Sequence, residues 1–128
     1  MFNRRLILFF IETVNFKTDA LVKYLEATKN RFSHFDATWK QNFHHASRQG
    51  KDCNISKIFE NTLVESTPEK TVTLVSNHDT QPLQALEAPV KAWFKPIAYA
   101  LILLHDQGYP CVFYPDLYGA HYKDKDKD

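Results

Sequence analysis

Short apolar runs of strand length alternate with longer amphipathic segments along this chain. The segment 6–11 is continuously apolar, which is typical of a strand buried on both faces of a sheet. Further strands are predicted at 34–37, 71–76 and 111–114, and helices at 18–30, 55–64 and 88–107. Because this alternation favours parallel strands joined by right-handed crossovers, the predicted fold class is α/β. Two closures fit: a small open sheet, or part of a (β/α)8 barrel.

Capping and helix-breaking residues predict where the helices begin and end. Thr18 is expected to cap the first helix, and no helix or strand is assigned to the polar stretch from the second strand to Gly50. Pro68 stops any helix before the third strand. Pro96 either kinks the last helix or marks its beginning, and Gly108 ends it.

Length and charge limit the domain organisation and the partners. The 128 residues allow one domain, expected at 1–122, with a charged, disordered tail at 123–128. With 16 Lys and Arg against 15 Asp and Glu, no charge excess indicates nucleic acid or an anionic membrane surface as a partner. No run reaches the roughly 20 apolar residues of a membrane helix. The first apolar run lacks the cleavage site of a signal peptide, so a cytoplasmic location is expected.

The spacing of cysteines and histidines does not fit the common metal sites. Cys53 and Cys111 have no C-x-x-C spacing and are expected to be reduced thiols. The adjacent pair His44 and His45, like the other histidines, lacks His-x-x-x-His spacing. No metal ligand is therefore assigned in this chain.

The third predicted strand ends in three polar side chains, Asn77, His78 and Asp79. An α/β barrel places its chemistry at the carboxyl ends of its strands, so the triplet indicates a functional site. The alternative is a turn, because Asn-His-Asp-Thr before Pro82 is good turn chemistry and Asp79 could simply cap it. The triplet alone leaves both interpretations open.

Several motifs together resemble the α-amylases of the large retaining α-glucan-hydrolase family. They are V-S-N-H-D-T-Q at 75–81, W-F-K-P at 93–96, Q-G-Y-P at 107–110 and V-F-Y-P-D-L-Y-G at 112–119. The chain looks most like the liquefying, bacterial-type branch, which also has intracellular fungal members, and the resemblance covers nearly all of it. It implies a partial (β/α)8 TIM barrel, roughly strands five to eight with the intervening helices.

The same resemblance implies roles for individual residues. Asp79 matches the Asp that follows strand seven and holds the sugar, and Glu12 matches the general acid/base Glu of strand five. His78, Asn77 and Tyr118 are implied substrate-binding residues, with Tyr118 near the end of the last strand. The nucleophilic Asp of strand four has no counterpart, because its Gly-x-Arg-x-Asp pattern does not occur in the sequence.

Two segments beside the implied cleft depart from the family pattern. Ile11 precedes Glu12 and Thr13-Val14 follow it, where relatives have a small residue before the Glu and an aromatic pair after it. T-W-K-Q at 38–41 stands where relatives tend to have a Pro-Leu-His-Tyr-like segment. The sugar-stacking surface beside Glu12 is therefore expected to differ from that of relatives.

The implied activity is endo-hydrolysis of α-1,4-glucosidic bonds in starch or glycogen, with α-glucan as the partner. A retaining glycosidase needs a nucleophile about 5 Å from its acid/base, so the isolated chain is expected to be inactive. Unpaired strand edges are expected to cause self-association. Calcium is the usual structural ion of the family, with its main ligands expected outside this chain. The alternatives are a non-catalytic truncated product or glucan-binding module, and a small independent α/β domain.

Overall fold

The computed structural model describes residues 10–11 and 17–119. Its strands form one parallel sheet in the order β1-β2-β3-β4, so every strand lies next to its neighbour in sequence. The strands are β1 (Phe10–Ile11), β2 (Ser33–Phe35), β3 (Thr71–Leu74) and β4 (Tyr109–Cys111). The α/β class and the parallel arrangement are confirmed. The predicted strand 6–11 is confirmed where it is described, while residues 6–9 lie outside the described residues.

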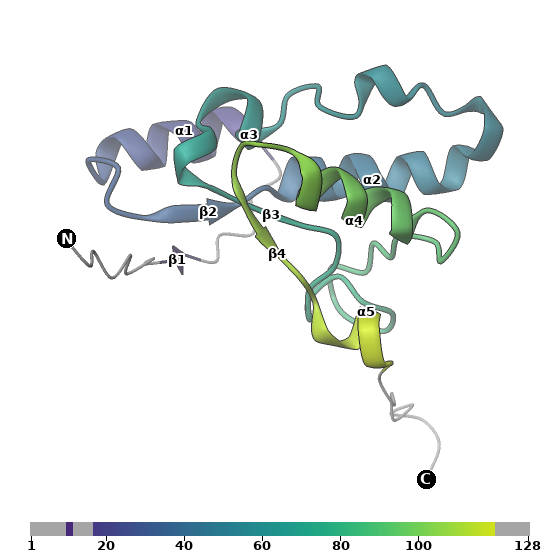
Figure 1. Cartoon of the computed structure of the whole chain (residues 1–128). Helices are drawn as coiled ribbons and strands as arrows, with labels where there is room; N and C mark the ends of the chain where they lie inside the picture. The colour runs from purple at the N-terminus through teal and green to yellow at the C-terminus, as the bar shows by residue number, and fades with distance from the viewer. Residues whose placement is uncertain (1–9, 12–16, 120–128) are drawn as a thin grey trace, which may run out of the picture.

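The strand order bears on the two closures that the sequence left open. A doubly wound open sheet reverses its strand order at a switch point, whereas a (β/α)8 barrel adds each strand beside the last. The four strands here are added in one direction without a reversal. Figure 1 shows helices α1, α2, α3 and α4 gathered along one side of these strands. The order of the described strands therefore shows no switch point of a doubly wound sheet.

The first helix, α1, runs from Thr18 to Ala27 and confirms the predicted element. The prediction that Thr18 caps it is wrong, because Thr18 is already helical and Lys17 is the cap residue, with no side-chain capping bond. The Thr18 hydroxyl instead donates to the Asn61 carbonyl and lies 3.0 Å from the Thr38 hydroxyl. These long-range partners hold the start of α1 against two other segments.

The polar stretch to which the sequence assigned no helix or strand contains a 13-residue helix, α2, from Ala37 to Gln49. Asp36 caps it by accepting a 2.9 Å hydrogen bond from the Trp39 backbone N–H. Trp39, Phe43 and Ala46 recur at helical spacing and are all buried. This apolar stripe is narrow and the rest of the segment is polar, so the helix was not recognised from the amino-acid composition.

The helix predicted at 55–64 is wrong. The segment contains a 3-10 turn at Ile55–Lys57, and a new short helix, α3, begins at Leu63 and ends at Ser66. Asn61 has a φ of 58°, in the left-handed region, so one continuous helix cannot pass through it. The Thr62 hydroxyl then caps α3 by accepting from the Glu65 N–H at 3.3 Å.

The C-terminal half contains the third predicted strand and the third predicted helix. β3 confirms the strand at 71–76, and all four of its residues are buried. Helix α4 spans Lys95–Leu104 with Pro96 in its first turn, so the proline marks the beginning of the helix and does not kink it. The strand predicted at 111–114 is β4, shifted toward the N-terminus. Tyr114 is not in a strand, because it begins a short helix, α5, at Tyr114–Tyr118.

The main core lies between the sheet and helices α2 and α4. Its buried members are Trp39, Phe43, Ala46, Ile58, Val64, Val75, Val90, Phe94, Ala98 and Ile102. A second cluster joins α1 to α3. Within residues 10–11 and 17–119, no helix combines the length and the apolarity that crossing a membrane would require.

Candidate functional site

The candidate site lies at the carboxyl edge of the sheet, where β3 and β4 end side by side. Leu74 of β3 is in register with Cys111 of β4. Asn77 lies three residues after Leu74, and Tyr114 lies three residues after Cys111. Because neighbouring strands lie about 4.8 Å apart, the two segments leave the sheet next to each other. The predicted triplet and helix α5 therefore share one edge.

The triplet opens a tight, internally bonded turn. The Asn77 Oδ1 atom accepts hydrogen bonds from the Thr80 N–H at 3.1 Å and from the Thr80 hydroxyl at 2.7 Å. Thr80 is buried, and its carbonyl accepts from the Ala88 N–H at 3.1 Å. The Asn77 side-chain oxygen is thus engaged in shaping the turn, which positions His78 and Asp79.

His78 and Asp79 are adjacent and partly exposed. The His78 Nε2 and Asp79 Oδ1 atoms are 3.5 Å apart, and the side chains are 66% and 36% exposed. The turn interpretation and the site interpretation are therefore compatible, because Asn77 and Thr80 build the turn while the side chains of His78 and Asp79 keep part of their surface in contact with solvent. A carboxylate held in this way can accept hydrogen bonds from hydroxyl groups of a ligand.

Of the two other predicted site residues, the structure describes only Tyr118. Glu12 lies outside the described residues. Tyr118 is on α5, and its side chain is 72% exposed. Its ring packs on the ring of Tyr114, with the centroids 4.5 Å apart and the planes tilted by 31°.

A buried acid that the sequence analysis did not single out holds α5 against α4. Asp116 accepts a hydrogen bond from the Lys95 ammonium and another, at 2.7 Å, from the Tyr99 hydroxyl. The Phe113 N–H donates in turn to the Tyr99 oxygen at 3.3 Å. Burial, followed by the hydrogen bond to Asp116, raises the pKa of the Tyr99 hydroxyl, so it stays a donor. The spacing of residues along the sequence does not predict this cluster, because Lys95 and Tyr99 belong to α4 and Asp116 belongs to α5.

Helix α2 holds the segment that follows the triplet's turn. The buried Lys40 ammonium donates to the Ala88 carbonyl, and the His44 Nδ1 atom lies 2.6 Å from the Pro89 carbonyl. Ser47 completes the contact, because its hydroxyl accepts from the Lys91 N–H at 3.2 Å. Lys40 belongs to the T-W-K-Q segment that departs from the family pattern, and that departure was the only signal that could have drawn attention to it.

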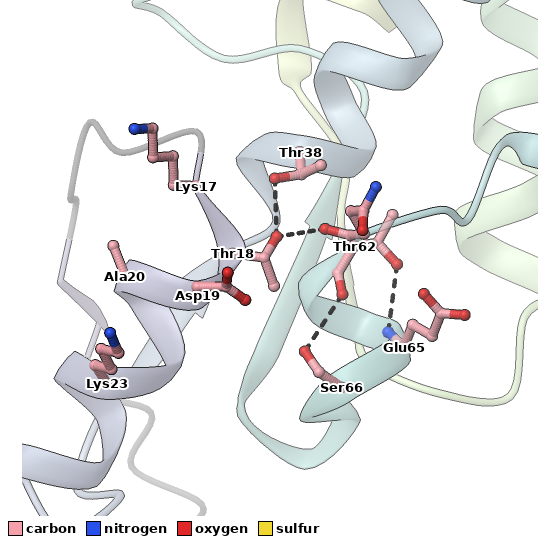
Figure 2. A pocket seen from close by; sticks show the side chains of 10 residues that line it. Lys17, Thr18, Asp19, Ala20, Lys23, Thr38, Thr62, Glu65 and Ser66 are labelled. Carbon is pink, nitrogen blue, oxygen red and sulfur yellow. Dashed lines mark hydrogen bonds between the residues drawn. The ribbon is translucent and has the colours of Figure 1, made fainter.

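A pocket of about 620 Å³ lies elsewhere, between the starts of α1, α2 and α3 (Figure 2). Its lining combines lysines, carboxylates and hydroxyls: Lys17, Thr18, Asp19, Ala20, Lys23, Thr38, Asn61, Thr62, Glu65 and Ser66. The hydroxyls bond within the protein, as in the contact of Ser66 with the Thr62 carbonyl at 3.3 Å. The two charge signs balance, and no predicted site residue lines the pocket. Its chemistry therefore selects no ligand.

Metal binding has no support in the part of the chain that the structure describes. Among residues 17–119, no group of three or more His, Cys, Asp or Glu side chains could hold an ion. The adjacent histidines have other contacts, since His45 pairs with Gln41 at 3.0 Å and His44 with Pro89. Cys53 and Cys111 are free thiols.

Comparison with known proteins finds close relatives, although no family model matches the chain. It is 58% identical over 108 residues, 84% of its length, to the cytoplasmic α-amylase of Escherichia coli K12. It is 50% identical over 101 residues to the α-amylase of Bacillus licheniformis, and 47% identical over 100 residues to the glucan 1,4-α-maltohexaosidase of Bacillus sp. strain 707, matching 79% and 78% of this chain. The matched segments cover only 22%, 20% and 19% of those proteins.

Proposed function

We propose, from the premise that this segment belongs to the α-amylase family, that the chain forms the second half of an α-amylase barrel, roughly strands five to eight. In this proposal it binds α-glucan but does not cleave it alone. The observation that carries the proposal is the position of His78 and Asp79 at the carboxyl edge of a parallel sheet whose strands follow one another in sequence. That edge is where a (β/α)8 enzyme binds its substrate.

Each proposed role follows from the chemistry of retaining glycosidases. Glu12 protonates the oxygen of the leaving sugar and later activates water, and Asp79 accepts hydrogen bonds from sugar hydroxyls. His78 donates to a hydroxyl of the same ring, while Asn77 keeps the turn in shape through Thr80. The covalent step needs a second carboxylate, and the sequence has no Gly-x-Arg-x-Asp segment to supply it.

A paired assay of binding and turnover tests this proposal. The purified chain is expected to bind maltoheptaose in a calorimetric titration and to release no reducing sugar from soluble starch. Asp79→Asn should weaken binding about tenfold, because a charged acceptor of sugar hydroxyls is lost. Asp106→Asn is the matched control. Asp106 is an exposed acid that precedes β4, so it lies at the amino ends of the strands, away from the candidate site.

Two results would contradict the proposal. Starch hydrolysis that disappears in Glu12→Gln would show that this chain does not need the missing nucleophile strand. Equal affinities of the wild type and Asp79→Asn would remove Asp79 from the sugar site.

A second candidate is a glucan-binding module with no catalytic role. It is favoured by the partly exposed side chains of His78 and Asp79 in a chain that lacks the nucleophile pattern. Binding in the titration is common to both candidates. Hydrolysis after a polypeptide carrying the first half of the barrel is added would identify the chain as an enzyme half, and its absence would favour the binding module.

We also propose that the strand edges cause self-association. Among the described residues, β1 pairs only with β2 and β4 only with β3, which leaves backbone groups available at both edges. Sedimentation of the chain is expected to give species larger than 15.0 kDa. A monodisperse monomer across the micromolar range would contradict this and favour an independent domain.

A further inference from the structure

Leu83 combines an exposed apolar side chain with a backbone conformation that leucine rarely adopts. It is 63% exposed, and its φ is 68°, in the left-handed region. Among the described residues, the other non-glycine residues with positive φ are Lys29, Asn30 and Asn61. Asparagine tolerates this conformation, whereas a bulky side chain is strained in it. Leu83 is the apolar member of this set.

The conformation of Leu83 belongs to a turn at 81–84. The Gln84 N–H donates to the Gln81 carbonyl at 3.4 Å, with Pro82 and Leu83 between them. A proline in the second position and a positive φ in the third are the features of a type II turn, where glycine or asparagine normally stands third. A glycine would make the same turn without strain. Burial does not offset the strain, because most of the leucine side chain lies in solvent.

The loop that carries Leu83 is held in place by hydrogen bonds. The Ala88 N–H donates to the Thr80 carbonyl at 3.1 Å, which closes the loop at its base. Within the loop, the Leu83 N–H donates to the Glu87 carboxylate at 3.0 Å. Lys40 of α2 donates to the Ala88 carbonyl from outside. Compact loops whose ends meet often carry function, and a loop that is ordered beforehand loses little conformational freedom on binding.

The loop begins where the turn of the candidate site ends. The Thr80 hydroxyl donates to the Asn77 Oδ1 atom at 2.7 Å, so Thr80 closes the turn that carries Asp79 and also forms the base of the loop. One face of a glucopyranose ring carries mainly C–H groups, which lose contact with water against an aliphatic side chain, while its hydroxyls donate to carboxylates. A carboxylate and an exposed leucine on consecutive turns offer both kinds of contact.

We propose that Leu83 is a specificity-determining contact of the α-glucan, whose side chain packs against the C–H face of a glucose unit beside the unit that Asp79 holds. This inference rests on the proposed function and extends it to a loop for which the sequence analysis assigned no role. It explains why leucine stands where glycine would fit the turn better. Glu87 is a positioning residue, because it holds the Leu83 N–H and with it the strained turn.

Substitutions at position 83 separate the side chain from the backbone strain. In calorimetric titrations of the full 128-residue chain with maltoheptaose, Leu83→Gly and Leu83→Ala should each weaken binding about fivefold, because a partly buried aliphatic contact is lost. Leu83→Gly also relieves the strain, so its urea midpoint should be higher than that of Leu83→Ala. Leu83→Met keeps an apolar side chain of similar volume and should bind as the wild type does.

Lys29→Gly is the matched control. Lys29 has a φ of 54° and lies between α1 and β2, at the amino ends of the strands. Relief of its strain should raise the urea midpoint and leave the affinity for maltoheptaose unchanged. The role of Glu87 is tested by rescue. Glu87→Ala should weaken binding, while Glu87→Gln retains an acceptor for the Leu83 N–H and should keep most of the affinity.

The outcomes separate this inference from the proposed function. If Asp79→Asn weakens binding and Leu83→Ala does not, the leucine contact is wrong and the proposed site stands. If Leu83→Ala weakens binding and Asp79→Asn does not, the contact stands without the proposed role of Asp79. Equal losses of affinity in Leu83→Met and Leu83→Ala, or a loss in Lys29→Gly, would overturn the contact. A wild type that binds no maltoheptaose would overturn both proposals. Circular dichroism of each variant checks that the fold persists.

Discussion

Asp36→Ala is expected to lower the free energy of unfolding of this chain by about 3 kcal/mol, because two buried backbone donors lose a charged acceptor. Asp36 is fully buried at the end of β2. Its Oδ1 atom accepts from the Trp39 N–H at 2.9 Å, and its Oδ2 atom accepts from the Val64 N–H at 2.8 Å. One carboxylate thus caps α2 and joins it to the first turn of α3.

The size of this effect follows from competing terms. Burial raises the pKa of Asp36, while the N–H donors of Trp39, Val64 and Leu63 lower it, so part of the favourable bonding offsets the cost of desolvation. Removing the carboxylate relieves that cost but leaves the buried N–H groups of Trp39 and Val64 without their acceptor. The second effect dominates, since an unsatisfied buried donor costs about 1–3 kcal/mol.

Urea unfolding followed by tryptophan fluorescence measures the effect, because Trp39 is fully buried beside the cap. Asp36→Asn keeps the shape but has only one oxygen, so it should lose about 2 kcal/mol, between the wild type and Asp36→Ala. Asp52→Ala, at an exposed acid, should stay within about 0.5 kcal/mol of the wild type. If Asp36→Ala also stayed within that range, the double cap would have no energetic role.

The elements that the sequence predicted correctly are those whose signal is local and continuous. The apolar runs of β1 and β3 and the broad apolar periodicity of α1 and α4 are of this kind. Helix α2 was missed because its buried face is a narrow stripe, with Trp39, Phe43 and Ala46 separated by polar residues. The helical spacing of these three residues, together with Asp36 as an N-cap residue before them, would have predicted the helix.

The position of the candidate site was predictable from the sequence, but the hydrogen bonds that hold it in place were not. The polar triplet after β3 could be read from the sequence, because it ends a buried strand. The contacts that hold the triplet in place could not be read from the sequence. The Thr80 hydroxyl donates to the Asn77 side chain because of the turn geometry, and Lys40 donates to the Ala88 carbonyl 48 residues away. Tyr114 was predicted in a strand, yet Pro115 in the first turn favours a helix start there. Contacts of this length depend on the complete fold.

The stability that Lys40 confers is expected to increase with pH. Burial lowers the pKa of the Lys40 ammonium from 10.5 to about 8. Between these two pH values the unfolded chain binds more protons than the folded chain, so raising the pH stabilises the folded form. Comparison with Lys40→Met isolates this group, since the other lysines and tyrosines titrate in both proteins. From pH 7 to pH 10, the free energy of unfolding of the wild type should gain about 2 kcal/mol relative to Lys40→Met.

The same residue connects stability to the candidate site. A neutral amine can still donate to the Ala88 carbonyl, so the clamp on the segment after Thr80 survives deprotonation, whereas methionine removes it at every pH. Hydrogen exchange of the Ala88 N–H, which donates to Thr80, should therefore be faster in Lys40→Met than in the wild type at both ends of the range. Lys91→Met, at an exposed lysine of the same segment, should change neither quantity. A stability difference that stays constant from pH 7 to pH 10 would mean that the Lys40 ammonium keeps its hydration in the folded chain, and the contacts of α2 with the segment after Thr80 would then be those of His44 and Ser47.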